Sequence, residues 1–139
     1  MTEVADKTAY IDTSAVKLLI EDSDASKSLL RLMSEYVHKV SSAFLESEIS
    51  EAVEKLGKTQ RRAEKVLGYF ALFNPDRSLQ WENIRIYKGE ITKSATIIEA
   101  HHLASALYLH NGGWEVDFIC ASESQAKFAE ILGLRVVKI

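Results

Sequence analysis

A short apolar run near the N-terminus leads straight into a helix, and an aspartate stands at the junction. Residues 8–11 (TAYI) are typical of a β-strand that is buried on both faces. Asp12, Thr13 and Ser14 follow, all good helix-capping types, and Ala15 begins a helical pattern. This strand-to-helix passage favours an α/β fold with a parallel sheet.

The same alternation continues along the 139 residues. It predicts helices at about 25–37, 43–56, 59–73, 95–110 and 124–132, and strands at 40–42, 116–120 and 134–139. Residues 79–91 are the least regular part, with 84–87 as a short strand candidate. We therefore expect a single domain over residues 1–139, with a central parallel sheet of about four to five strands and helices on both faces. Functional sites in such folds lie beyond the carboxyl ends of the strands, where Asp12 stands.

Composition narrows the function classes. Lys and Arg number 17 against 20 Asp and Glu, for a net charge of -3, so nucleic-acid contact needs a local basic patch. Cys120 is the only cysteine, which excludes an internal disulfide and a cysteine-based metal knuckle. Residues 1–7 are polar, and no apolar run approaches membrane-spanning length. We expect a cytoplasmic protein without membrane association.

Two carboxylates occur at positions that the pattern of apolar residues predicts to be buried. Asp12 is either a helix cap, worth about 1 kcal/mol, or a metal ligand, because Thr13 or Ser14 can cap equally well. Glu48 falls inside an apolar arc when the helix is drawn at about 100° per residue. The arc is formed by Phe44, Leu45, Ile49, Ala52, Val53 and Leu56. An inward Glu48 needs a cation, a metal or a proton; the alternative is a side chain at the edge of the arc that reaches water.

The helix predicted for residues 95–110 is apolar almost all round, which is typical of a central helix. Its polar exceptions share one stripe that includes Glu99, His102 and His110. Glu99 and His102 are one turn apart, so a structural hydrogen bond between them is one interpretation and a functional pair is the other. An orienting role is favoured for His102, because Mg²⁺ and Mn²⁺ prefer oxygen ligands.

Four segments together resemble the motifs of PIN-domain nucleases, and VapC-like ribonuclease toxins in particular. They are YIDTSA at 10–15, SAFLESEI at 42–49, EAHHLASA at 99–106 and FICAS at 118–122, and the last continues without a gap through residue 134. The resemblance covers nearly the whole chain, with the motifs in the family's order and spacing. It implies a PIN-like three-layer fold, in which Asp12, Glu48 and Glu99 are the catalytic residues and ligands of Mg²⁺ or Mn²⁺.

The chain departs from the family in its last two motifs. The family usually has aspartate where this chain has Glu99, and threonine and aspartate where it has Cys120 and Ser122. The segment before Glu99 is also shorter. Because an acid is missing at Ser122, a second metal site is weakened more than the first. Glu123 is next to that position, but an ungapped match points its side chain elsewhere.

The resemblance implies a metal-dependent ribonuclease that hydrolyses phosphodiester bonds in RNA, either a VapC-like toxin or an RNA-processing nuclease. Thr13, Ser14 and Ser122 would orient water or phosphate, with His102 in support. The competing interpretation is a degenerate PIN domain that acts as a non-catalytic RNA- or protein-binding module. A flavodoxin-like regulatory domain also predicts an acid after the first strand, but it gives no reason for an inward Glu48.

Partners are suggested by two surface features. Five basic residues lie close together, and Lys58, Arg61 and Arg62 among them are candidates for RNA contact, unless the run is only a solvated helix face. Residues 66–73 are more apolar than one core-facing stripe needs, which favours a homodimer, as the resemblance also implies. A toxin-like protein is further expected to have a small antitoxin protein as its partner.

Overall fold

The computed structural model describes residues 7–21, 23–73 and 96–139 of the chain. Within these ranges, five parallel strands form one sheet in the order β3-β2-β1-β4-β5. The strands are β1 (Lys7–Ile11), β2 (His38–Ser42), β3 (Ala71–Phe73), β4 (Glu115–Cys120) and β5 (Arg135–Lys138). The predicted α/β fold with a parallel sheet is confirmed.

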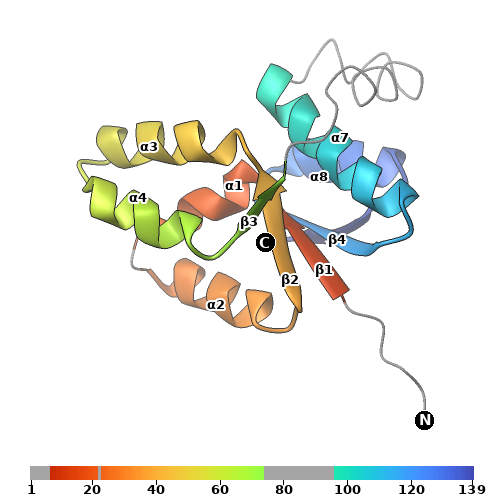
Figure 1. The fold of residues 1–139 in the computed structure, drawn as a ribbon, viewed down its shortest axis with the longest axis horizontal. Coiled ribbons are helices and arrows are strands. Elements are labelled where there is room, and N and C mark those ends of the chain that lie inside the picture. Colours follow the sequence, from red (N-terminus) through yellow and green to blue (C-terminus); the bar gives the residue numbers. More distant parts are fainter. Residues whose placement is uncertain (1–6, 22, 74–95) are drawn as a thin grey trace.

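Helices cover both faces of the sheet (Figure 1). One layer contains α1 (Thr13–Val16), the 3-10 turn η1 (Lys17–Leu19), α2 (Asp24–Met33), α3 (Leu45–Lys55) and α4 (Gln60–Leu67). The other contains α7 (Ile97–Asn111) and α8 (Glu123–Ile131). None of the helices in the described ranges combines the length and apolar character that crossing a bilayer requires.

Strand β1 lies at the centre of the sheet and is buried from both sides. Ala9 and Ile11 pack in the core on the α3 side, whereas Tyr10 packs in the core beneath α7. Ala9, Tyr10 and Ile11 are all 0% exposed, as expected for an apolar strand covered on both faces. The backbone N–H of Asp12 donates to the Ile119 carbonyl at 2.9 Å, so Asp12 is fixed at the edge where β1 and β4 end.

The helix predicted for residues 59–73 is wrong in its second half. Helix α4 ends at Leu67 with Gly68 as its C-cap, and Ala71–Phe73 form the edge strand β3 beside β2. Apolar residues at helical spacing suggested one long helix, but pairing with β2 satisfies the backbone of this short segment instead.

Other predicted boundaries shift by a few residues. Helix α2 ends at Met33 rather than Val37, and β2 begins at His38, two residues before the predicted strand. Helix α3 ends as expected before Gly57, whose φ of 68° is the left-handed conformation that favours glycine. The strand candidate at residues 84–87 lies outside the described residues.

A buried polar contact ties β4 to the segment before β2. Asp117 is 3% exposed, and its Oδ2 accepts a hydrogen bond from the Tyr36 hydroxyl at 2.7 Å. The Oδ1 atom of Asp117 lies 3.2 Å from Nε of Arg135 on β5. Asp117 pairs in register with Ala9, in the middle of β1 and not at its end, so Asp117 belongs to the scaffold.

Replacing Tyr36 with Phe tests this contact. The variant leaves Asp117 with one partner fewer, and we expect the free energy of unfolding to fall by about 1–3 kcal/mol.

The contribution of Tyr36 should also depend on pH. Burial, and next the hydrogen bond to Asp117, hold the pKa of Tyr36 well above its usual value. The unfolded chain therefore ionises Tyr36 above about pH 10 while the folded protein does not. In denaturant titrations, the difference between wild type and variant should be constant below that pH and shrink above it. Equal stability at neutral pH would contradict the role.

Candidate functional site

A pocket of about 290 Å³ opens at the carboxyl ends of the strands. It is lined by Asp12, Thr13, Ser14, Lys17, Glu48, Thr96, Ile98, Glu99, His102, Ser122 and Gln125. These lining residues include Asp12, Glu48 and Glu99, and also the four supporting residues that the sequence nominated. The structure thus brings residues from four separate segments to one place.

Asp12 acts as a helix cap and also faces the pocket. Its Oδ2 accepts from the Ser14 backbone N–H at 3.2 Å and from the Ser14 hydroxyl at 2.6 Å. Its Oδ1 accepts from Nε2 of Gln125 at 3.1 Å. The Ser14 hydroxyl oxygen in turn accepts from the Ala121 N–H at 2.9 Å, which ties the end of β4 to this corner. The two interpretations of Asp12 are therefore compatible, because the cap occupies mainly one carboxylate oxygen.

Thr13, Glu48 and His102 form a closed triangle of polar atoms. The Thr13 hydroxyl donates to Oε1 of Glu48 at 2.7 Å. Nε2 of His102 lies 2.6 Å from the Thr13 oxygen and 2.9 Å from the same Oε1. The hydroxyl proton of Thr13 is donated to Glu48, so neither oxygen near Nε2 of His102 has a proton to give to it. Nε2 is therefore assigned as the protonated, donating nitrogen of the ring.

The other ring nitrogen of His102 reaches the central strand. Its Nδ1 lies 2.8 Å from the Tyr10 hydroxyl. Burial, the largest cause, holds the pKa of Tyr10 well above its usual value, so the hydroxyl keeps its proton and donates to Nδ1. His102 is 1% exposed, and its two ring nitrogens are held from opposite sides, Nδ1 by Tyr10 of β1 and Nε2 by Thr13 and Glu48.

Glu48 lies where the helical arc placed it. Its side chain is 15% exposed and turns toward α7, where His102 is its partner. The spacing of Glu99 and His102 in α7 suggested a hydrogen bond between them, but the carboxylate that contacts His102 is that of Glu48, from α3. Sequence distance hides this contact, because 54 positions separate the two residues.

Glu99 lines the pocket, and its carboxylate takes part in a capping box. Oε1 of Glu99 accepts from the Thr96 backbone N–H at 3.0 Å, while the Thr96 hydroxyl accepts from the Glu99 N–H at 3.1 Å. This is the usual arrangement of threonine at the N-cap with glutamate three residues later. The cap uses Oε1, so a metal role for Glu99 would rest on Oε2 or on release of the cap.

Ser122 and Gln125 form the remaining wall, at the start of α8. The Ser122 hydroxyl caps α8 by accepting from the Gln125 N–H at 3.3 Å. Gln125 is 1% exposed, and its Nε2 donates to Asp12 and, at 3.1 Å, to the Glu99 carbonyl. Sequence reasoning missed Gln125, although its place three residues after an N-cap is one from which side chains turn back toward the helix start.

Cys120 is fully buried. Burial raises the pKa of its thiol to about 11, so the side chain stays protonated and is not a thiolate ligand near neutral pH.

The oxygens of this pocket suit a hard divalent cation in part. Within the described ranges, no group of three or more His, Cys, Asp or Glu side chains is placed to hold a metal. Asp12 and Glu48 are nevertheless carboxylates on one pocket, and the buried Oε1 of Gln125 has no hydrogen-bond partner there. Mg²⁺ is commonly held by one or two carboxylates, with water and substrate phosphate completing its shell. The oxygen atoms of Asp12, Glu48 and Gln125 are therefore of the types that Mg²⁺ and Mn²⁺ use.

The basic residues nominated for RNA contact divide into two kinds. Lys58 and Arg61 are exposed. Arg62 is half-buried, and its guanidinium donates to the carbonyls of Ile20 at 2.9 Å and Leu19 at 2.8 Å. Arg62 thus satisfies carbonyl groups at the end of η1.

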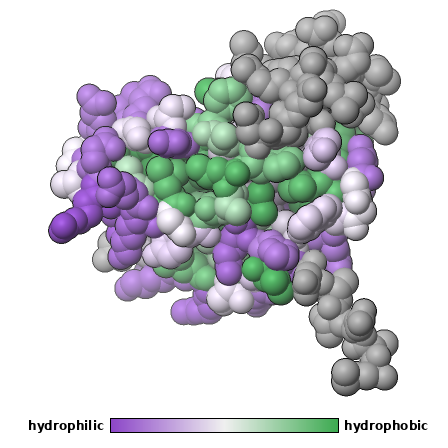
Figure 2. All heavy atoms as spheres, viewed as in Figure 1, coloured by the Kyte–Doolittle hydropathy of each residue, from purple (hydrophilic) through white to green (hydrophobic). Residues whose placement is uncertain are grey.

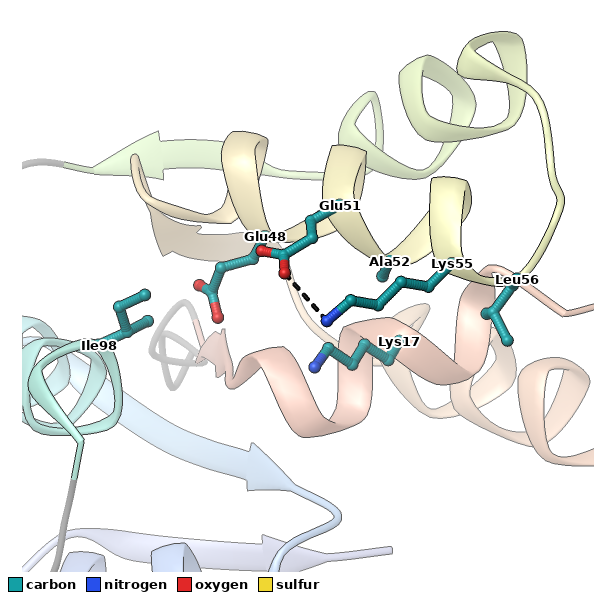
Figure 3. A pocket seen from close by; sticks show the side chains of 7 residues that line it. All are labelled: Lys17, Glu48, Glu51, Ala52, Lys55, Leu56 and Ile98. Atoms are coloured by element: carbon teal, nitrogen blue, oxygen red, sulfur yellow. Dashed lines mark ion pairs between the residues drawn. The ribbon is translucent and has the colours of Figure 1, made fainter.

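Lys17 is a cation that the sequence did not single out. It lines the candidate pocket and also a neighbouring one of about 330 Å³, which shares Glu48 and Ile98 with it. Figure 3 shows the Lys17 side chain reaching toward Glu48 and Glu51, close to Lys55, which pairs with Glu51 at 2.9 Å. The two pockets place a lysine directly beside the acidic residues.

Comparison with known proteins gives the fold. No model of a protein family matches the chain, and no curated protein sequence matches it. In structure the chain is similar to a chain of VapBC2 from Rickettsia felis, solved bound to a DNA fragment from their promoter. The TM-score is 0.66 over 94% of this chain and 98% of that one, at 15% identity. The fold is PIN-like. At this identity the likeness extends to the PIN-like fold alone.

Substitution of Thr13 tests the triangle. Thr13→Val keeps the shape of the side chain but leaves Glu48 and His102 without the hydroxyl between them. We expect Thr13→Val to lower the free energy of unfolding by about 1–3 kcal/mol. Thr13→Ser keeps the hydroxyl and should therefore be nearly as stable as the wild type. Chemical denaturation of both variants makes the comparison, and equal losses would mean that the methyl group, not the hydroxyl, matters.

The arginine pair provides a second test. Arg62→Met removes charged donors from two carbonyls, and we expect a loss of about 1–3 kcal/mol in the free energy of unfolding. Arg61→Met, one residue earlier on the exposed face, should change stability by less than about 0.5 kcal/mol. Thermal and denaturant unfolding measure both. If the two substitutions cost the same, Arg62 has no special capping role.

Proposed function

We propose that the protein is a Mg²⁺- or Mn²⁺-dependent ribonuclease that hydrolyses phosphodiester bonds in RNA. The observation that carries the proposal is one pocket, at the carboxyl ends of the strands, that is lined by Asp12, Glu48 and Glu99 together. When bound, the divalent ion supplies charge stabilisation at the phosphate and lowers the pKa of an attacking water. Asp12 and Glu48 are its proposed ligands, with Glu99 as the third, through Oε2 or after release from the Thr96 cap.

The other residues of the pocket position these carboxylates. His102 and Thr13 both contact Oε1 of Glu48, which directs Oε2 toward other partners. Ser14 holds Oδ2 of Asp12 through two hydrogen bonds, so this carboxylate has little rotational freedom. Groups held in this way lose little entropy when they bind an ion and a substrate. Ser122 is proposed to orient water or phosphate at the mouth of the pocket.

RNA would approach through local basic side chains, since the chain as a whole is acidic. Lys17 is proposed to contact a phosphate next to the acids, because it lines both adjoining pockets. Lys58 and Arg61 are proposed as more distant contacts. Arg62 is proposed to contact RNA only through the guanidinium N–H groups that do not donate to the carbonyls of Leu19 and Ile20.

Protein partners are proposed on a different surface. A cavity of about 510 Å³ follows the edge strand β3 and includes Leu72, which is 40% exposed, and Trp114, which is 48% exposed. Figure 2 shows hydrophobic side chains gathered near the centre of this face of the molecule. Such an apolar area favours a homodimer. A cytoplasmic toxin with a small antitoxin partner is the proposed biological setting, in keeping with the VapBC2 complex that the fold resembles.

Substitution of the two proposed ligands tests the function. With Mn²⁺ or Mg²⁺ present, the wild type should cleave single-stranded or structured RNA, and Asp12→Asn or Glu48→Gln should lower the rate at least about 100-fold. Glu46→Gln changes an exposed glutamate of α3, the helix that carries Glu48, and this variant should cleave RNA at the wild-type rate. Gel-based cleavage assays with and without chelator measure the effect. Cleavage that survives Asp12→Asn unchanged would refute the assignment.

Calorimetric titration with Mn²⁺ separates this function from its alternative. Binding near neutral pH that Asp12→Asn removes would support the nuclease. A wild type that binds no Mn²⁺ and cleaves no RNA would favour the non-catalytic binding module. That alternative draws on one observation, the commitment of the Glu99 carboxylate to a helix cap.

A further inference from the structure

Gln125 is a buried amide with one end satisfied and the other not. Its Nε2 donates to Oδ1 of Asp12 and to the Glu99 carbonyl, each at 3.1 Å. Its Oε1 is buried without a hydrogen-bond partner in the part of the chain that the structure describes. A buried oxygen without a partner is rare in native proteins and is explained by a bound water, an ion, a catalytic role or local strain.

The contacts at the opposite end of the amide, Nε2, point to an ion. Two oxygen acceptors, one of them a carboxylate, converge on Nε2, so this point favours positive charge. The Nε2 hydrogens supply only partial charge. If the amide turned over, Oε1 would face the same two oxygens, which is repulsive unless a cation stands among them. Carboxylate, backbone carbonyl and side-chain amide oxygens are all ligand types that hard divalent cations use.

We propose that Gln125 is a ligand of the divalent cation and exchanges one amide end for the other on binding. In the metal-free protein, Nε2 holds Asp12 and the Glu99 carbonyl in place. With Mg²⁺ or Mn²⁺ bound at Asp12, the amide turns and Oε1 becomes an oxygen ligand. Gln125 then adds a side-chain amide oxygen to the carboxylate ligands proposed above. The inference rests on the proposed metal-dependent function of the same pocket.

Mn²⁺ affinity of two variants is the first test. Gln125→Met is similar in shape but has neither donor nor hard oxygen, and it should weaken Mn²⁺ binding roughly tenfold or more in calorimetry. Gln125→Glu restores an oxygen ligand and should bind Mn²⁺ at least as tightly as the wild type. Gln60→Met, at an exposed glutamine of α4, is the matched control and should leave the affinity unchanged.

Nuclear magnetic resonance of the wild type distinguishes ligation from mere positioning. With glutamine side chains labelled with ¹³C and ¹⁵N, Mg²⁺ should shift the resonance of the Gln125 side-chain carbonyl carbon, Cδ. The resonances of the Nε2 protons should also change, because these protons lose their hydrogen bonds. Both changes should saturate together with Mg²⁺ binding. This readout needs no variant, so it holds even if Gln125→Met fails to fold.

Each outcome decides one of the two proposals. If the wild type binds Mn²⁺ but the Gln125 carbonyl carbon does not respond to Mg²⁺, the amide only positions Asp12 and the ligand assignment is wrong. Unchanged Mn²⁺ affinity in Gln125→Met would also show that the ligand assignment is wrong. A wild type that binds no divalent cation overturns the proposed function itself, and the role of Gln125 with it.

Discussion

A single buried histidine joins the parts of this molecule that form the pocket. His102 lies on α7 and contacts Tyr10 of the central strand, Thr13 at the start of α1, and Glu48 of α3. Tyr10 belongs to the sheet, and Thr13 and Glu48 belong to the helical layer opposite α7, so the ring fixes α7 relative to the sheet and to that layer at the edge where the strands end. Because His102 is 1% exposed, its polar atoms depend on these partners, and the partners constrain one another in turn. The position of Glu48 in the pocket follows from this contact.

Strand β1 supplies the other constraint. It pairs with β2 and β4 and is buried on both faces, so the residue after it has few choices of direction. Asp12 is bonded through its backbone to Ile119 and through its side chain to Ser14 and Gln125. The carboxylate accepts hydrogen bonds from two segments, Ser14 next to it and Gln125 on α8. The same donors that make Asp12 a good cap also give its carboxylate a fixed orientation, which a metal ligand needs.

Sequence patterns predicted what depends on periodicity and missed what depends on contact between distant segments. The strand at β1 and the inward turn of Glu48 follow from spacing alone, and both are present. The edge strand β3 has the apolar spacing of a helix, because three residues that pair with a neighbour carry little pattern of their own. The partner of His102, the capping contacts of Arg62 and the contacts of Gln125 all join residues more than 20 positions apart. No local spacing encodes such contacts.

The position of Glu99 reflects a competition between two uses of one carboxylate. As a helix cap it satisfies the Thr96 N–H, a contribution of about 1 kcal/mol. A divalent cation held by Asp12 and Glu48 would attract the same carboxylate far more strongly than a neutral N–H does. The Thr96 N–H lies at an exposed helix start and can bond water when Glu99 leaves. The cap is therefore weak enough to be released, which would free both oxygens of Glu99 toward the pocket that it lines.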